Sequence, residues 1–395
     1  MKILLGGVPL GCDNIGDEAI IACVVRLLRT LVPSVRLTVC TRDGENTSHL
    51  LGVETVPLYG FPPAPDLPGF ASEVAKHDVF IWFGATGLSD YPERTLRLLD
   101  IAREAGARTV VWGVGMNSQL NPAFYRAAGK RLVLLRLLSL CSCGLLNWVD
   151  IYENFLRDRT RRHISRSLEA CELVVLRDGE SVKEVEKCGF RRAVTGADTA
   201  ILQQASSRLP LEPAPDAVRI GFCISAQNAV QDPEGVKKLW NSLLERPNIR
   251  IVLIPMNPRT DRALMLKLAS GIGHAGRIEC LESALPADVQ ACASQCRVVV
   301  SSRLHLLILA SNALVPGLGI ERGSKIANYL KAFGRTSSGS VDNCDFAVLE
   351  REILELAALP AETVRPRMAS VMAGMHARLD DASLMLKGVL TGQDR

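Results

Sequence analysis

The 395-residue chain has few aromatic residues, little net charge and no basic runs interleaved with aromatic residues. Phe, Trp and Tyr make up 5% of the chain, and 46 Lys and Arg nearly balance 42 Asp and Glu. A nucleic-acid surface needs clustered basic residues with aromatic residues among them. We therefore expect no nucleic-acid partner.

The chain also lacks the cysteine patterns of a metal site or a redox motif. Its twelve cysteines include no Cys-x-x-Cys pair and no Cys/His cluster with zinc spacing. They are scattered through strand-like and helix-like segments, which predicts reduced, buried thiols in a cytoplasmic protein.

Signals for export or membrane insertion are weak. The opening MKILLGGVPLG has one lysine and a very short apolar stretch, so we expect no signal peptide and a cytoplasmic protein. The most apolar segment, 131–152, is interrupted by Arg136 and followed by charged residues, which argues against a bilayer-spanning helix. We interpret it as a core or interface helix, with peripheral contact at the inner face of a membrane as the alternative. The oligomeric state, a homo-oligomer included, stays open.

Strand-like and helix-like segments alternate along the chain, which predicts parallel βαβ units with helices on both sheet faces. A stretch rich in proline, serine and small residues, 203–218, lacks apolar periodicity and marks a linker. The alternation then starts again. The sequence thus predicts an α/β protein with two Rossmann-like domains, 1–205 and 216–345, a cleft between them, and C-terminal helices over 346–395.

The first loop that follows a strand is GGVPLGCDNIGDEAI (6–20). It has neither the Gly-Lys-Ser/Thr ending of a Walker A loop nor the Gly-x-Gly-x-x-Gly spacing of a dinucleotide site. Asp17 at the start of the helix would repel a phosphate bound there, so sugar hydroxyls or amides are the expected ligands. A capped helix with a glycine turn is an equally weighted alternative.

Basic residues follow strands in both halves of the chain. Arg303 and His305 stand between the apolar run RVVV and a helix-like segment, and Arg177 follows VVL. Guanidinium groups, one imidazole and Lys325 would suit a small substrate with several negative charges. The structural alternatives are a pair between Arg177 and its neighbour Asp178, and an exposed lysine at 325.

These residues lie in stretches that resemble a known family. GGVPLGCDNIGDEAI and SSRLHLLILASNALVPGLGIERGSKIANYL (301–330) resemble the two signature regions of the polysaccharide pyruvyl transferase family, and three landmarks between them also match: VVLRDGESV, GVGM and TGADTAIL. The resemblance covers about residues 1–335. It implies a GT-B-like architecture, with phosphoenolpyruvate as donor. It also implies that a pyruvyl ketal is placed on two hydroxyls of a sugar in a cell-surface glycan or its lipid-linked precursor.

The resemblance also implies roles for individual residues. The implied donor site falls on Arg303, Leu304 and Lys325 of the second domain (216–345, the phosphoenolpyruvate side), with His305 as the proton donor. It also includes Arg177, which follows the interdomain-facing strand of the first domain (1–205, the acceptor side). The expected acceptor-binding residues on the N-terminal side are Asn14, Gly16 and Asp17. This scheme requires no metal and no redox cofactor.

Two departures concern the acceptor. The chain has FGATG (83–87) where the family often has three consecutive glycines, and MNPRTD (256–261) where it often has a histidine.

Two rival functions also stay open. One is a GT-B glycosyltransferase that uses a nucleotide sugar, for which GLGIERGSK offers only a partial binding loop. The other is a non-catalytic relative that binds glycans or phosphate, against which the retention of Arg303, His305 and Lys325 argues.

Overall fold

Two parallel sheets organise the protein. The computed structural model describes residues 1–142, 145–214 and 216–392. The first sheet has the order β3-β2-β1-β4-β5-β6-β7. Its strands are β1 (Lys2–Gly6), β2 (Arg36–Thr41), β3 (Glu54–Pro57), β4 (Val79–Phe83), β5 (Arg108–Val114), β6 (Leu173–Leu176) and β7 (Val194–Thr195). Helices cover both faces of this sheet, so its central strands are apolar throughout, and Leu5 of β1 is buried between Val39 and Ile81.

The second sheet has the order β10-β9-β8-β11-β12, again with all strands parallel. Its strands are β8 (Val218–Cys223), β9 (Ile249–Leu253), β10 (Ile278–Cys280), β11 (Val298–Ser301) and β12 (Gly317–Gly319). In both sheets the second and third strands of the domain extend the sheet to one side of the first strand, and the later strands extend it to the other side. This is the strand order of a Rossmann fold, and it confirms the predicted α/β architecture.

Helices fill the connections. The first domain contains α1 (Ile15–Leu31), α2 (Gly44–Leu51), α3 (Leu67–Val74), α4 (Gly87–Asp90), α5 (Pro92–Glu104), α6 (Gly129–Cys141), α7 (Trp148–Glu169) and α8 (Gly179–Lys187). The second contains α9 (Pro233–Leu244), α10 (Thr260–Ala269), α11 (Pro286–Ser294), α12 (Leu304–Asn312) and α13 (Ser324–Lys331). Short 3-10 helices lie at η1 (Pro122–Phe124), η2 (Thr199–Leu202) and η3 (Ala275–Arg277).

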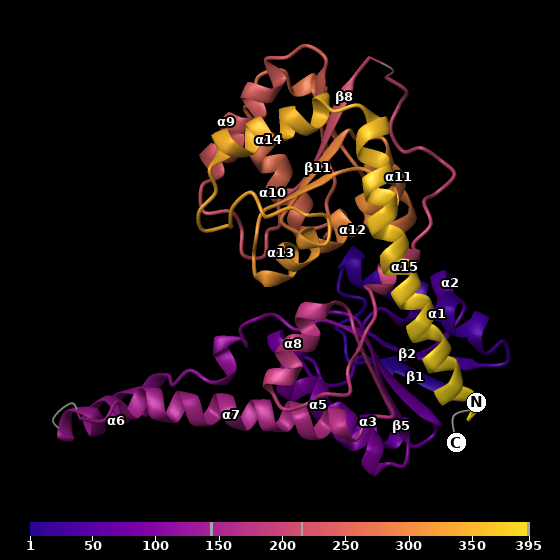
Figure 1. Ribbon diagram of the computed structural model, residues 1–395, viewed down its shortest axis with the longest axis vertical. Coiled ribbons are helices and arrows are strands. Elements are labelled where there is room, and N and C mark those ends of the chain that lie inside the picture. The colour runs from indigo at the N-terminus through magenta and orange to yellow at the C-terminus, as the bar shows by residue number, and fades with distance from the viewer. Residues whose placement is uncertain (143–144, 215, 393–395) are drawn as a thin grey trace.

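The C-terminal segment is helical, as predicted, and its two helices pack on different domains. Helix α14 (Phe346–Ala358) packs on α9, whereas α15 (Ala361–Thr391) runs back across both domains to the first sheet (Figure 1). Leu379 and Leu386 of α15 are buried in the core of the first domain. The last turns of α15 therefore pack on the domain that contains β1.

The segment at 131–152 differs from a core helix. Helices α6 and α7 form an arm that projects from the first domain (Figure 1), and Leu135 is the buried residue of α6. The leucines that made the sequence resemble a core helix are mostly exposed. Within the described part of the chain, no helix combines the length and apolarity needed to cross a membrane.

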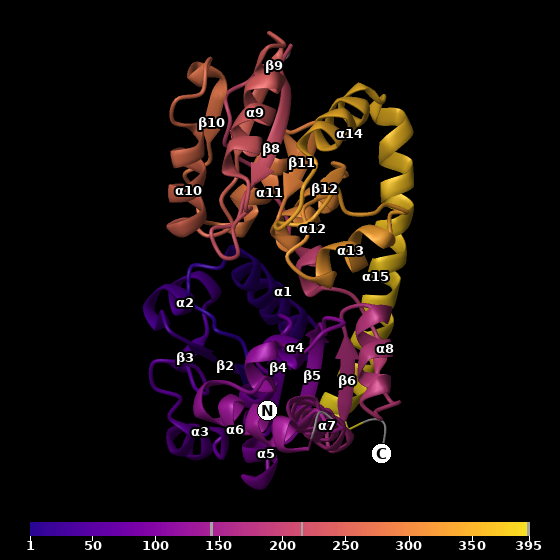
Figure 2. The same ribbon diagram turned by 90° about the vertical axis from the view of Figure 1, so that its left-hand side faces the viewer.

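In each sheet the strand order reverses next to the first strand of the domain. The reversal lies between β1 and β4 in the first sheet and between β8 and β11 in the second. The carboxyl ends of these four strands point toward the other domain (Figure 2). Loops that leave neighbouring strands on opposite sides of a sheet diverge at such a point and leave a crevice. The two crevices meet in one cavity.

Candidate active site

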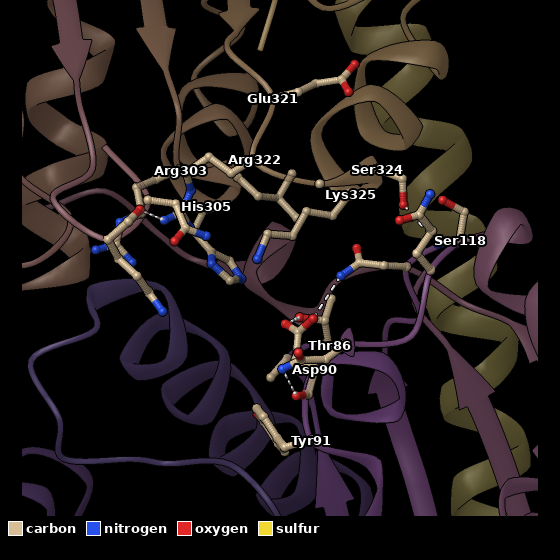
Figure 3. A pocket seen from close by; sticks show the side chains of 18 of the residues that line it. Thr86, Asp90, Tyr91, Ser118, Arg303, His305, Glu321, Arg322, Ser324 and Lys325 are labelled. Atoms are coloured by element: carbon tan, nitrogen blue, oxygen red, sulfur yellow. Dashed lines mark hydrogen bonds between the residues drawn. The ribbon is translucent and has the colours of Figure 1, made fainter. Parts of the chain in front are cut away.

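The interdomain cavity has a volume of about 810 Å³. From the first domain it is lined by the loops after β1, β4, β5 and β6, and from the second by the loops after β8, β11 and β12. Figure 3 shows the side chains of His305, Lys325 and Asp90 around this space. Of the eight residues predicted for the site, seven line the cavity: Asn14, Asp17, Arg177, Arg303, Leu304, His305 and Lys325.

Gly16, the eighth, lies beneath His305 rather than in the cavity wall. Asn14 caps α1 by accepting a hydrogen bond from the Gly16 backbone N–H at 3.3 Å. A Cβ added to Gly16 would lie 2.1 Å from Nδ1 of His305. The imidazole therefore packs directly on the first turn of α1, and only a residue without a side chain permits this approach.

His305 is on the first turn of α12, and its side chain is 14% exposed. Its Nε2 lies 3.5 Å from Oδ2 of Asp198, the residue that caps η2. The same carboxylate oxygen lies 3.8 Å from Nη1 of Arg177. Burial alone would raise the pKa of Asp198, but His305 and Arg177 offset burial and hold this pKa below its usual value. Asp198 therefore stays ionised and orients both basic groups.

Arg303 is held by a buried carboxylate. Its Nε and Nη2 donate to Asp261 at 3.0 and 2.9 Å, and the Asp261 side chain is fully buried. Asp261 also accepts from the backbone N–H groups of Ala226 and Asn257. These two hydrogen bonds fix the guanidinium group of Arg303, and its Nη1 remains available to bind a ligand.

Two further cations have no carboxylate partner among the described residues. Arg322 donates to Oγ of Ser225 at 2.8 Å and to the backbone oxygen of Gln227. Burial, reinforced by Arg303, lowers the pKa of Arg322 to about 10. Burial also lowers the pKa of Lys325 to about 8, with Asp90 opposing this effect. Because desolvation disfavours these charges, an anion in the cavity would stabilise both.

Carboxylates line the opposite, N-terminal wall. Asp17 is buried, burial raises its pKa, and the nearby His305 opposes that rise. Asp90 accepts hydrogen bonds from Thr86 Oγ1 and, at 2.9 Å, from Asn117 Nδ2. Ala85, next to this cluster, has a φ of 59°, a strained conformation for a residue with a side chain. The cavity is thus cationic on one wall and acidic on the other.

Sequence reasoning missed Asp90, Arg322 and Asp261. Asp90 lies in the FGATGLSDYPE loop after a strand, and Arg322 is three residues before Lys325, so their positions were visible signals. No such signal marked Asp261, because its role depends on contact with Arg303, 42 positions further along the chain. Among the described residues, no group of three or more His, Cys, Asp or Glu could hold a metal ion.

A family model described as polysaccharide pyruvyl transferase matches residues 14–324. The match includes all predicted site residues except Lys325, which follows its last residue. No curated protein sequence matches the chain significantly.

Solved structures share the fold at low sequence identity. A putative UDP-N-acetylglucosamine 2-epimerase from Listeria monocytogenes is 12% identical, with a TM-score of 0.63, over 100% of this chain and 97% of that one. The UDP-GlcNAc 2-epimerase from Neisseria meningitidis is 13% identical, with a TM-score of 0.59, over 99% and 100%. A spinosyn rhamnosyltransferase is 13% identical, with a TM-score of 0.57, over 99% and 100%. These similarities establish a GT-B fold.

Proposed function

Because the chain belongs to the polysaccharide pyruvyl transferase family, we propose that it transfers a pyruvyl group from phosphoenolpyruvate to a sugar. The acceptor is a unit of a cell-surface glycan or its lipid-linked precursor. The product is a pyruvate ketal, and inorganic phosphate is released. The observation that carries this proposal is the pairing of an imidazole with uncompensated cations on one wall of a cavity and carboxylates on the other.

The cationic wall suits the donor. Phosphoenolpyruvate carries a phosphate and a carboxylate on the same carbon, so it needs two clusters of positive charge a few ångströms apart. Lys325 and Arg322 are free of carboxylate partners among the described residues, and Arg303 retains Nη1. Arg177 adds charge behind His305. Guanidinium and ammonium groups of this kind bind oxyanions through charge-assisted hydrogen bonds.

The reaction begins with protonation of the donor. His305 donates a proton to the methylene carbon, which becomes a methyl group and leaves positive charge on the adjacent carbon. One sugar hydroxyl attacks that carbon, forms a C–O bond and loses its proton. Asp198 stabilises the protonated imidazole before the transfer, because its carboxylate lies 3.5 Å from Nε2.

The second hydroxyl completes the ketal. It forms a second C–O bond while the bond between the carbon and the phosphate oxygen breaks, and its proton leaves with phosphate. One of the two hydroxyl protons thus replaces the proton taken from His305, and the other goes to phosphate. Asp17 is the proposed relay for the first proton: it accepts this proton from the hydroxyl and passes it to the imidazole, which restores both groups. Burial raises the pKa of Asp17, and Asp17 lies on the acceptor wall near His305.

The test is phosphate release from phosphoenolpyruvate in the presence of a panel of sugar acceptors that differ in the positions of their hydroxyls. We expect release that depends on one acceptor class and gives one mole of ketal for each mole of phosphate. A chain that instead consumes a uridine or guanosine diphosphate sugar, with no phosphate from phosphoenolpyruvate, would be a glycosyltransferase. A chain that binds phosphoenolpyruvate without any turnover would be a non-catalytic relative.

A further inference from the structure

The α6–α7 arm exposes a large apolar surface. The exposed apolar residues of α6 and of the segment after it form what we call the arm face: Val133, Leu134, Leu137, Leu138, Leu140, Leu145 and Leu146. Leu140 is 74% exposed and Leu145 is 86% exposed. Near the tip of the arm, Ile151 and Phe155 of α7 are exposed as well. Such a concentration of large apolar side chains on a projecting element marks a surface that has a partner.

The arrangement of charge around the arm face indicates which partner. At about 100° per residue, the exposed apolar residues of α6 occupy one sector of the helix, and Arg131 and Arg136 lie on either side of that sector. Arg131 donates a hydrogen bond to Tyr152 of α7, whereas Lys130 lies at the N-terminal end of the sector itself. Residues 129–149 include three basic residues and no acidic residue. An apolar sector bordered by arginines is the pattern of a helix that lies in a membrane interface, where arginines extend toward lipid phosphates.

We propose that the arm face docks the protein on a bilayer surface that contains anionic lipids. A second copy of the chain fits this surface less well. Pairing α6 with α6 would place three basic residues from each copy (Lys130, Arg131 and Arg136) in one interface, with no acidic residue of the helix to compensate. Two acidic residues, Asp150 and Glu153, stand at the start of α7 and have partners within the arm: Asp150 accepts a hydrogen bond from Asn147 Nδ2, and Glu153 accepts one from the Ala127 backbone N–H. Farther along α7, four arginines (Arg157, Arg159, Arg161 and Arg162) surround Asp158 and extend the positive charge.

The arm can reach a surface without blocking the cavity. It projects away from both domains (Figure 1), and its residues from 129 onward do not line the cavity. The segment that leads into it does, through Asn117, Asn121 and Pro122 on the acceptor wall. Docking would therefore hold the acceptor side of the cavity near the bilayer, where a lipid-linked sugar is found. This last step rests on the proposed function, whereas docking itself does not.

The experiment is vesicle flotation of the full chain without substrates. Vesicles of phosphatidylcholine with one third phosphatidylglycerol are compared with phosphatidylcholine alone. We expect flotation with the anionic vesicles, and binding that is about fivefold weaker for each of Lys130 and Arg136 replaced by glutamine. Replacing two exposed leucines, in the variant L137E/L140E, should weaken binding at least tenfold. The matched control L209E/L384E changes two leucines that are equally exposed elsewhere and should bind like the unaltered chain.

Folding and self-association are measured on the same samples. The melting temperature of L137E/L140E should stay close to that of the unaltered chain, because both side chains already face solvent. If the melting temperature falls, the variant L137A/L140A is used in place of L137E/L140E, since alanine favours the helix. Sedimentation velocity reports the oligomeric state. The proposal is overturned if the unaltered chain does not float with the anionic vesicles, or if the control variant loses as much vesicle binding as L137E/L140E. It is also overturned if the chain binds no vesicles and forms a dimer that the L137E/L140E substitutions dissociate.

Discussion

His305 is the residue whose chemistry decides the mechanism. Glutamine can keep a hydrogen bond at similar reach but cannot donate a proton near neutral pH. If His305 protonates the donor, His305→Gln should keep the affinity for phosphoenolpyruvate within a few-fold and lower turnover by roughly 10²–10⁴. The measurements are donor affinity by calorimetry and turnover by phosphate release at saturating donor.

The same variant distinguishes the other roles. A histidine that only holds the phosphate would lower donor affinity and leave saturated turnover high. A structural histidine would lower the melting temperature and leave the activity of the folded fraction unchanged. Near-normal turnover of His305→Gln at saturating donor would remove His305 from the acid role.

The lowered pKa of Lys325 predicts that donor binding depends on pH. Its pKa is lowered to about 8, so the ammonium that would hold the donor loses its proton as the pH rises through that value. One pH unit above a pKa, about one tenth of the groups stay protonated, so the dissociation constant should rise about tenfold between pH 7 and pH 9. Arg322, whose pKa is about 10, stays charged over this range.

The control for this pH dependence is Lys325→Arg, which keeps its charge at pH 9. Its dissociation constant for phosphoenolpyruvate, measured by calorimetry in buffers of matched ionic strength, should change little between pH 7 and pH 9. A tenfold rise in this variant as well would show that another group, or the donor itself, titrates.

At the scale of elements, the contact between α1 and α12 aligns the two domains at the reacting centre. Alanine at position 16 would suit the helix, by roughly 0.5–1 kcal/mol relative to glycine, but its Cβ would lie 2.1 Å from His305 Nδ1. We expect Gly16→Ala to displace the imidazole and to lower turnover at least tenfold while the protein stays folded. Turnover at saturating donor and the melting temperature are the measurements.

The matched control is Gly374→Ala in α15, where the nearest atom to an added Cβ is 3.9 Å away. There the same change gains helix propensity with no clash, so the melting temperature should rise slightly and turnover should not change. Equal turnover in the two variants would mean that the approach of α1 to His305 has no catalytic consequence.

The sequence predicted elements and their order well, because parallel strands buried on both faces are nearly continuous apolar runs. Most of the predicted site residues line one cavity for a related reason: each lies in the loop after a strand or in the first turn of the helix that follows, and the carboxyl ends of parallel strands meet at one edge. Pairings between distant segments could not be predicted. Asp261 takes two of the donors of Arg303, and Asp198 faces His305, through contacts that only the packed domains create.

Helix α6 shows what the composition of a segment does not predict. Its apolar composition predicted a core or interface helix, but composition does not say what surrounds a helix. Sequence periodicity identifies an apolar sector, whereas exposure depends on whether another element covers it. Here α7 covers one side of α6, and the arm face stays uncovered within the described chain.

At the scale of the whole molecule, several contacts hold the domains together around the cavity. The backbone N–H of Ile15 donates to Met256 at 3.0 Å, that of Ser118 donates to Ser324 Oγ at 3.1 Å, and Lys331 pairs with Glu180 at 2.9 Å. Helix α15 adds a continuous connection across both domains (Figure 2). A ligand in the cavity contacts both domains and should therefore stabilise them as one unit.

Phosphoenolpyruvate should accordingly raise the melting temperature of the whole protein. A ligand that binds only the native state stabilises it by mass action, by about 2.7 kcal/mol at a hundred times its dissociation constant, which corresponds to a shift of a few degrees. Uridine and guanosine diphosphate sugars should give no such shift, because the loops that follow the strands have neither the Walker A ending nor the dinucleotide spacing that would hold a nucleotide. Lys325→Ala should lose most of the shift, since it removes a cation that has no carboxylate partner among the described residues. Scanning calorimetry with each ligand decides the matter: a clear shift with a nucleotide sugar and none with phosphoenolpyruvate would assign the cavity to a nucleotide-sugar glycosyltransferase.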